Sequence, residues 1–232
     1  MKISIIIPAY NEGKRITPTL VSYYNFFKKK FNTDFEIIVV PNNCSDDTLE
    51  ITEKFSKDKE QIRILNIEGY SGKGGAVIMG FKLARGDYVG FTDADNSTDP
   101  ENFYKLYENK GDYVGIIASR KIKGASMVPK RKFKQNFSSF LFNRAVRALF
   151  GLKYKDTQCG AKLFTKDILG LLIQNFSETG WIFDVDFLHI CKKNNLKILE
   201  QPITWKDAEG SKLTLKDGVS SFLALMKLRA RG

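Results

Sequence analysis

The first 118 residues alternate between short apolar runs and segments with helical periodicity, and this alternation narrows the possible folds more than any other feature. Residues Lys2–Pro8 and Phe35–Val40 are mainly apolar runs, a pattern typical of strands buried on both faces. Between these runs, large apolar residues recur at helical spacing, at Ile16, Leu20, Tyr24, Phe27 and Phe31. The pattern indicates a strand, a helix and a second strand.

The same alternation continues to residue 118. Further strands are predicted at Ile62–Ile67, Asp87–Thr92 and Asp112–Ala118. Helices are predicted near Thr48–Lys57, from Ala76 to about Gly86, and from Pro100, with Asp99 as its N-cap. Alternating strands and helices with short loops favour an α/β fold, in which helices flank both faces of a mostly parallel sheet.

The second half of the chain follows a different pattern. A basic loop at 120–132 precedes a predicted helix at Lys134–Phe150. A short strand, two helices, a strand and a last basic helix follow, at Ala161–Phe164, Lys166–Phe176, Asp184–Asn194, Lys197–Ile203 and Leu215–Arg231. We therefore expect two halves, 1–118 and 119–232, within one compact domain.

The net positive charge lies in the second half of the chain. The chain has a net charge of +11, yet residues 1–118 carry 15 Lys and Arg against 17 Asp and Glu, whereas residues 119–232 carry 22 against 9. This segregation indicates an anionic partner for the second half, either a nucleic acid, a membrane surface or a phosphorylated substrate. No helix-turn-helix, zinc-finger or aromatic RNA-binding pattern accompanies it, so we expect no nucleic-acid partner.

Cysteine and histidine usage argues against disulfides and against zinc. The three cysteines show no CxxC spacing, and the lone histidine, His189, precludes a multi-histidine metal site. No run of about 18 apolar residues is present, and the apolar start at Ile3–Ala9 is too short for a signal peptide. We expect a cytoplasmic protein, either free or peripheral on the cytosolic face of a membrane.

The strongest chemical motif is Asp93-Ala94-Asp95, which directly follows a predicted buried strand. In an extended segment, residues two apart point to the same side, so both carboxylates can address one ion. Carboxylate oxygens suit Mg²⁺ or Mn²⁺, and such ions commonly share their site with substrate phosphates. Asp93 and Asp95 are therefore candidate metal ligands, although a polar turn with a capping aspartate would have the same sequence.

Three further polar segments follow predicted strands. Pro8-Ala9-Tyr10-Asn11-Glu12 ends the first strand, and a segment that begins Pro41-Asn42 ends the second. Ligands of open α/β sheets bind beyond the carboxyl ends of strands. The third segment, Gly72-Lys73-Gly74-Gly75, precedes a helix whose exposed N–H groups would attract an anion. Lys73 is therefore a candidate for binding the phosphates of a ligand. A flexible turn is an equally good interpretation of this segment.

Together these motifs resemble the family 2 glycosyltransferases, which have the GT-A fold. The second half resembles dolichyl-phosphate glucosyltransferases and, more broadly, polyprenyl-phosphate hexose synthases. The segments that carry this resemblance are Ser119-Arg120, Lys130-Arg131, Phe142-Asn143, Asp156-Thr157-Gln158-Cys159-Gly160, Trp181-x-Phe183-Asp184-Val185-Asp186 and Gly210-Ser211-Lys212. The resemblance covers nearly the whole chain and implies an enzyme that uses a nucleotide-sugar donor.

The resemblance also implies roles for individual residues. Pro8, Tyr10 and Glu12 would line the nucleotide pocket, and Asp93 and Asp95 would bind metal and diphosphate. Arg120 and Arg131 would grip phosphate, because a guanidinium pairs with two oxygens at once. The family usually has two aspartates after the second strand, which contact base or ribose, and this chain has Pro41 and Asn42 there, so Asn42 would hydrogen-bond to the nucleotide without a charge. Many relatives have Gln where this chain has Ser97. Because of these departures, the identity of the nucleotide stays open. A relative that has lost catalytic activity also stays an alternative.

The expected reaction is a single displacement with inversion. A hexose, with glucose from UDP-glucose as first choice, would pass to a polyprenyl or dolichyl phosphate; GDP-mannose or another sugar donor is the alternative. A phosphate monoester is already anionic near neutrality, because its second pKa is about 6, and needs no strong base. Asp186 falls where relatives with hydroxyl acceptors place their base. Here it would orient a substrate, or serve as base if the acceptor is a hydroxyl, or simply complement a helix dipole.

The two basic helices of the second half offer a site for an anionic membrane surface. Residues 134–150 and 215–231 mix Phe and Leu with Lys and Arg, a composition typical of interfacial helices. Packing of their apolar stripes on the core explains the same composition equally well.

Overall fold

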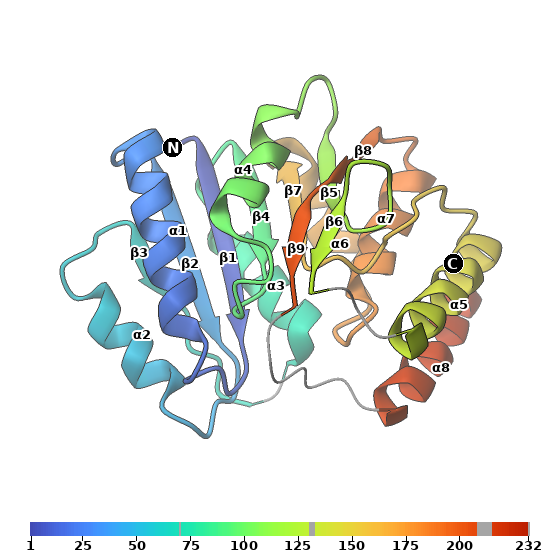
Figure 1. The fold of residues 1–232 in the computed structure, drawn as a ribbon, viewed down its shortest axis with the longest axis horizontal. Coiled ribbons are helices and arrows are strands. Elements are labelled where there is room, and N and C mark those ends of the chain that lie inside the picture. The colour runs from blue at the N-terminus through green and yellow to red at the C-terminus, as the bar shows by residue number, and fades with distance from the viewer. Residues whose placement is uncertain (70, 130–132, 208–214, 232) are drawn as a thin grey trace.

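The computed structural model describes residues 1–69, 71–129, 133–207 and 215–231. Its centre is a seven-stranded sheet in the order β3-β2-β1-β4-β7-β5-β8 (Figure 1). These strands are β1 (Ile3–Ala9), β2 (Phe35–Pro41), β3 (Ile62–Ile64), β4 (Tyr88–Thr92), β5 (Gly115–Ser119), β7 (Ala161–Thr165) and β8 (Ile198–Pro202). All neighbours pair in parallel except β7, which runs antiparallel between β4 and β5. The α/β fold with a mostly parallel sheet is thus confirmed.

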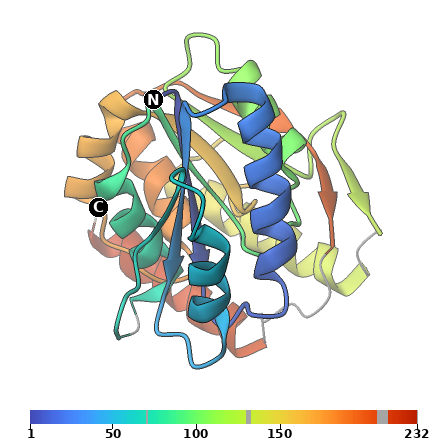
Figure 2. The same ribbon diagram turned by 90° about the vertical axis from the view of Figure 1, so that its left-hand side faces the viewer.

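Helices cover both faces of this sheet, as predicted (Figure 2). One face packs against α1 (Ile16–Phe31), α2 (Thr48–Ser56) and α4 (Pro100–Glu108). The other packs against α3 (Gly72–Leu83), α6 (Leu169–Asn175) and α7 (Phe183–Lys193), with α5 (Phe133–Phe150) and α8 (Leu215–Arg231) beyond them. A short 3-10 helix, η1 (Lys166–Ile168), leads into α6. Within β1, Ile5 and Ile7 face the first core whereas Ile6 faces the second, the two-residue period of a strand buried on both sides.

The described helices include none long and apolar enough to cross a membrane.

Two local features differ from the expected ones. The helix predicted from Ala76 begins at Gly72, so the expected loop at 72–75 is its first turn. Inside the expected loop at 120–132, β6 (Ser126–Val128) pairs in parallel with β9 (Thr204–Lys206) as a second, two-stranded sheet. The periodicity of a three-residue strand is too short to recognise, and its pairing partner is far away in the sequence.

The sheet brings the polar segments of the first half to one edge. Because β1, β2 and β4 are parallel neighbours, their carboxyl ends lie together, with Ala9 opposite Pro41. The antiparallel β7 begins at the same edge, where Ala161 pairs with Thr92. Asp99 caps α4 as predicted, since its Oδ1 accepts a 2.9 Å hydrogen bond from the amide of Asn102.

Candidate active site

Asp93 and Asp95 lie beyond the carboxyl end of β4, each in a different set of contacts. The Oδ1 atom of Asp95 accepts a 3.0 Å hydrogen bond from the amide of Ser97, and its Oδ2 lies 3.9 Å from a guanidinium nitrogen of Arg15. Arg15 in turn makes two 2.7 Å hydrogen bonds to the carboxylate of Glu12. Burial and the nearby charge of Asp93 raise the pKa of Asp95. The first polar loop and Asp95 therefore form one network.

Asp93 pairs with a lysine and lies against a glycine. Its Oδ1 atom forms an ion pair with the ammonium of Lys73, from the first turn of α3. Its Oδ2 faces Gly160, where an ideal Cβ would lie only 1.8 Å from that oxygen. Burial disfavours the charge on Lys73, but the carboxylates of Asp93 and Asp184 outweigh this and raise the pKa of Lys73. A side chain at position 160 would therefore force the Asp93 carboxylate to move.

Two amides of the 72–75 segment donate within the protein, which differs from the expectation that the N–H groups of this segment are exposed to an anion. The amides of Gly74 and Gly75 both donate to the carbonyl of Thr179, at 2.9 and 3.4 Å. Gly72 has a φ of +69°, and an ideal Cβ there would lie 2.2 Å from the same carbonyl oxygen. Only a residue without a side chain fits so close an approach. The glycines therefore serve helix packing, and Lys73 alone extends toward the carboxylates.

Asn42 holds the start of α3 in place. Its side-chain oxygen accepts hydrogen bonds of 3.1 Å from the amide and the hydroxyl of Ser71, and its side-chain nitrogen donates to the carbonyl of Gly72 at 3.1 Å. The side chain is buried. Its assignment to the nucleotide stays a prediction, because the contacts it makes here are all with the protein.

The other residues predicted for the nucleotide differ in exposure. Pro8 is buried within β1, whereas Tyr10 is 45% exposed at the sheet edge. The amide of Glu12 donates a 2.7 Å hydrogen bond to the hydroxyl of Thr48. Tyr10 is thus the exposed aromatic side chain of this loop, and its contact with a base stays a prediction.

A buried ion pair between Lys162 and Asp184 lies next to this cluster, and no sequence pattern indicated it. Lys162 stands on β7 with no exposed surface; its ammonium contacts the carboxylate of Asp184 and donates to the carbonyl of Cys159 at 3.0 Å. Asp184 lies in the first turn of α7. Burial raises the pKa of Asp184, while Lys162 and Lys73 act in the opposite direction. Asp93, Lys73, Asp184 and Lys162 thus alternate in charge.

Asp186, the residue predicted as base or orienting group, lies elsewhere. Two residues along an α-helix are separated by about 200°, so Asp184 and Asp186 point to different sides of α7. The Oδ2 atom of Asp186 accepts hydrogen bonds from the amides of Ser177 and Glu178, at 2.8 and 3.0 Å. It lines a cavity between α7 and α8 with His189 and Arg231. The structure therefore brings Asp184, rather than Asp186, to the charged cluster.

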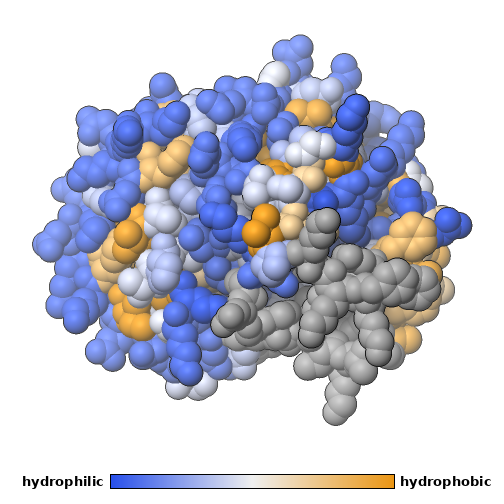
Figure 3. Space-filling view, in the orientation of Figure 1, coloured by the Kyte–Doolittle hydropathy of each residue, from blue (hydrophilic) through white to orange (hydrophobic). Residues whose placement is uncertain are grey.

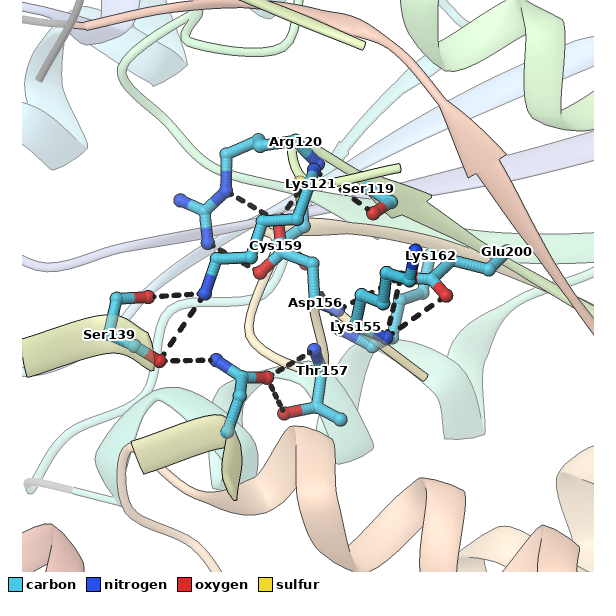
Figure 4. Close-up of polar contacts among 11 residues, drawn as sticks. Ser119, Arg120, Lys121, Ser139, Lys155, Asp156, Thr157, Cys159, Lys162 and Glu200 are labelled. Carbon is cyan, nitrogen blue, oxygen red and sulfur yellow. Dashed lines mark hydrogen bonds and ion pairs between the residues drawn. The ribbon is translucent and has the colours of Figure 1, made fainter. Parts of the chain in front are cut away.

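Arg120 is held by Asp156, the first residue of the Asp156-Thr157-Gln158-Cys159-Gly160 segment (Figure 4). Two parallel hydrogen bonds of 2.7 and 2.8 Å join the guanidinium to the carboxylate, and the Arg120 amide adds a third at 2.9 Å. Arg120 also lies 5.4 Å from the centroid of the Trp205 ring. Burial opposes the ionised form of Asp156, but Arg120 outweighs it and lowers the pKa of Asp156 to about 2.

The same segment is joined to two other elements, β8 and α5 (Figure 4). Glu200 on β8 accepts from the amides of Lys155 and Asp156, at 3.0 and 2.9 Å. Asn143 on α5 accepts from the amide and hydroxyl of Thr157, both at 3.2 Å. This loop carries Gly160 to the carboxylate of Asp93. Its polar residues thus connect the second half of the chain to the carboxylate cluster.

Arg131, the second predicted phosphate-binding arginine, lies outside the described residues, as do Lys130 and the Gly210-Ser211-Lys212 segment.

The carboxylates fit a divalent cation that takes part of its coordination from a ligand. Among the described residues, no group of three or more His, Cys, Asp or Glu side chains converges as a metal cage. Asp93 and Asp95 offer oxygen ligands, and the ammonium of Lys73 already places a positive charge on Asp93. Few protein ligands and remaining positions for water and phosphate are usual for Mg²⁺ bound with nucleotides.

Known proteins resemble this chain in both sequence and fold. Residues 4–172 match the profile of Glycosyl transferase family 2. The chain is 32% identical over 237 residues to the dolichyl-phosphate beta-glucosyltransferase of Dictyostelium discoideum, with 97% of this chain and 72% of that protein covered. The Saccharomyces cerevisiae protein of the same name is 32% identical over 232 residues, with 92% and 69% covered.

Solved structures show the same architecture. Glucosyl-3-phosphoglycerate synthase from Mycobacterium tuberculosis, in complex with Mn²⁺, UDP-glucose and phosphoglyceric acid, matches with a TM-score of 0.70 at 17% identity, over 99% of this chain and 80% of that one. TarS from S. aureus, in complex with UDP-GlcNAc, matches with a TM-score of 0.63 at 23% identity, over 99% and 66%. At these identities the likeness concerns the fold. The chain therefore belongs to glycosyl transferase family 2 and is a glycosyltransferase with the predicted GT-A fold.

Proposed function

We propose that the protein transfers a hexose, glucose from UDP-glucose, to a polyprenyl phosphate such as dolichyl phosphate, with inversion at the anomeric carbon. The observation that carries the proposal is that Asp93 and Asp95 follow β4 at the carboxyl edge of the sheet, where Lys73 is paired with Asp93 and its charge acts on Asp95. Two carboxylates and an ammonium together suit a diphosphate that arrives with a divalent cation. The choice of sugar and acceptor follows the dolichyl-phosphate beta-glucosyltransferases that the chain resembles.

Asp93 and Asp95 would hold Mg²⁺ or Mn²⁺. When bound, the cation would offset the negative charge that grows on the departing nucleoside diphosphate. Other residues of the chain would bind the nucleotide and the phosphates. Tyr10 and the loop to Glu12 border the nucleotide side, and Lys73 offers a positive charge to the diphosphate. Arg120, held in a fixed orientation by Asp156, would present its remaining N–H groups to a phosphate.

The state of Asp184 supports a phosphate acceptor. A hydroxyl acceptor loses a proton during transfer, so its enzyme needs a carboxylate that can take one. Asp184 is the acid of α7 nearest the cluster, and its carboxylate is paired with the buried ammonium of Lys162. Asp186 is engaged with the 177–178 backbone. A phosphate monoester carries its charge already and needs neither group as a base.

Exposed apolar side chains on α5 and α8 support an acceptor that resides in a membrane. The two helices pack against each other (Figure 1). Both carry side chains that are about half exposed. These are Phe140, Leu141, Phe222, Leu223 and Met226. Figure 3 shows apolar surface at the edge of the molecule where these helices lie. Arg144, Arg147, Lys227 and Arg229 stand on the same helices, so the pair combines the two features of an interfacial site for anionic lipid.

The test is direct. Purified protein is incubated with labelled UDP-glucose and dolichyl phosphate in the presence of Mn²⁺ or Mg²⁺, and the lipid product is extracted and counted. We expect glycolipid that requires the metal and that falls by about 100-fold in Asp95→Asn, the loss typical of removing an electrostatic group at a reacting phosphate. Asp112→Asn, a change at an exposed acid, should leave the rate unaltered. Product from GDP-mannose alone would correct the donor, and no product from either donor would refute the proposal.

A further inference from the structure

Lys73 occupies the position on Asp93 that a divalent cation would need. The ammonium is paired with Oδ1 of Asp93, and Oδ2 faces the backbone of Gly160. The Asp93 and Lys73 side chains are 28% and 21% exposed, so solvent screens their charges only in part. A cation on the same carboxylate would lie next to the ammonium and be repelled by it. Lys73 must therefore leave Asp93 when a metal ion arrives.

The backbone beneath Lys73 is fixed, so the movement is confined to its side chain. Gly74 and Gly75 donate to Thr179, and Asn42 holds the carbonyl of Gly72. The ammonium lies 5.9 Å from the centroids of both the Trp181 and Phe183 rings. A four-carbon lysine stem can swing while its helix stays in place.

Among the described residues, Asp184 and Asp95 are the other acids whose charges act on Lys73. Asp184 is already paired with Lys162, and Asp95 lies 3.9 Å from Arg15 and would itself bind the cation. Lys162 is fully buried, and the Cys159 carbonyl fixes it further. The new negative charge that can receive Lys73 is thus the diphosphate of the donor, which arrives at the same carboxylates.

We propose that Lys73 holds the place of the divalent cation on Asp93 in the free protein and transfers to the donor diphosphate on binding. The inference rests on the proposed function, because it takes a nucleoside diphosphate and a divalent cation as the two ligands. Without the diphosphate, a metal ion has to displace the Lys73 ammonium from Asp93, and the ammonium then has no new anionic partner. With it, the same displacement gives Lys73 a doubly charged partner. Metal and donor therefore bind cooperatively, and Lys73 contributes part of the coupling.

Equilibrium binding of Mn²⁺ tests this without any turnover. The electron paramagnetic resonance signal of free Mn²⁺ gives its affinity with and without UDP, for the wild type, Lys73→Met and Lys82→Met. Lys82 stands in the last turn of the same helix and is exposed, so it is the matched control. We expect Lys73→Met to bind Mn²⁺ alone about tenfold more tightly, the scale of a partly buried ion pair. The gain should vanish with UDP present, so the enhancement by UDP falls about tenfold, while Lys82→Met behaves as wild type.

The ratio of the two affinities is the decisive quantity. A lysine that merely repelled the cation and stayed in place would change Mn²⁺ affinity by the same factor with and without UDP. An unchanged ratio in Lys73→Met, or no tightening of Mn²⁺ alone, would overturn the inference. Urea unfolding confirms that the variant is folded, and Lys73→Gln replaces it if the methionine variant is not.

Asp93→Asn separates this inference from the proposed function. One outcome is that Asp93→Asn abolishes Mn²⁺ binding while Lys73→Met leaves the ratio of Mn²⁺ affinities with and without UDP unchanged. This outcome would support the metal site and exclude the proposed role of Lys73. If the wild type binds no Mn²⁺ even with UDP, the metal-dependent reaction fails, and the inference fails with it.

Discussion

Lys162 places its ammonium against the carboxylate of Asp184 in the interior, with no exposed surface on the lysine and 5% on the aspartate side chain. A charge with so little access to water is tolerated because the partner and the Cys159 carbonyl both contact it. The pair joins β7, the one antiparallel strand of the sheet, to the first turn of α7. It thereby fixes the side of α7 that faces Lys73 and Asp93.

Removing only one partner of this pair should be costly. Lys162→Met leaves the Asp184 carboxylate buried without its cation, and we expect a loss of about 3–5 kcal/mol in the free energy of unfolding. The double variant Lys162→Met with Asp184→Leu removes both charges and should recover most of it. Urea unfolding at neutral pH measures both changes. Equal destabilisation of the single and double variants would show that the lysine stem, rather than the charge, is what matters.

The Arg120–Asp156 pair predicts a particular dependence of stability on pH. The pKa of Asp156 falls from its usual 3.8 to about 2 in the folded protein. A lowered carboxylate pKa stabilises the folded state above the unfolded pKa, and this contribution disappears as the pH falls from about 4 to about 2. Its size is about 2 kcal/mol.

Asp156→Asn isolates this contribution. The variant is less stable than the wild type at pH 7, because Arg120 loses its partner. The difference in unfolding free energy should shrink by about 2 kcal/mol between pH 5 and pH 2, since the wild type alone loses the ionised carboxylate. Denaturant titrations of both proteins across this range measure it. A difference that stays constant with pH would show that Asp156 does not titrate there.

Much of the fold could be predicted from the sequence because it depends on local patterns. The apolar runs at β1 and β2, the periodicity of α1 and the Asp99 cap were all found where expected. Asp93 and Asp95 were recognised because a short acidic motif follows a buried strand. Each of these features is determined by residues close together in the chain.

The parts that could not be predicted depend on contacts between distant segments. Lys162 stands in a short strand, Ala161–Thr165, where an isolated lysine normally indicates an exposed face. It is buried because β7 inserts between β4 and β5, and its partner Asp184 lies on a separate helix. The choice between Asp184 and Asp186 depends on the rotation of α7, which the sequence leaves open. The amides of Gly74 and Gly75 are satisfied by Thr179, about 100 residues later.

Gly160 should be intolerant of even one methyl group. In Gly160→Ala, the new Cβ would lie 1.8 Å from Oδ2 of Asp93, so the carboxylate has to move. A shift of about 1 Å in a positioning group can lower turnover about 100-fold, and we expect a loss of that order in metal-dependent transfer.

Gly170→Ala is the matched control, because an ideal Cβ at that position has no neighbour within 4 Å. It lies in α6, where alanine favours the helix, so stability should rise by no more than about 1 kcal/mol and transfer should be unaffected. Steady-state rates under saturating Mn²⁺ compare the two variants. Wild-type turnover in Gly160→Ala would mean that Asp93 has no fixed position in the reaction.

The exposed apolar face of α5 and α8 should bind anionic vesicles. Leu223 is 57% exposed on α8, and burying such a side chain in an interface contributes about 1.5–3 kcal/mol when complete. We expect Leu223→Ser to lower partitioning onto phosphatidylserine-containing vesicles about tenfold without altering stability.

Val21→Ser is the control, because Val21 is 40% exposed on α1, away from this face. Salt should weaken binding of both variants, since the basic residues contribute by screened attraction. Co-sedimentation measures the partitioning, and equal binding by Leu223→Ser and the wild type would exclude this face as the membrane contact.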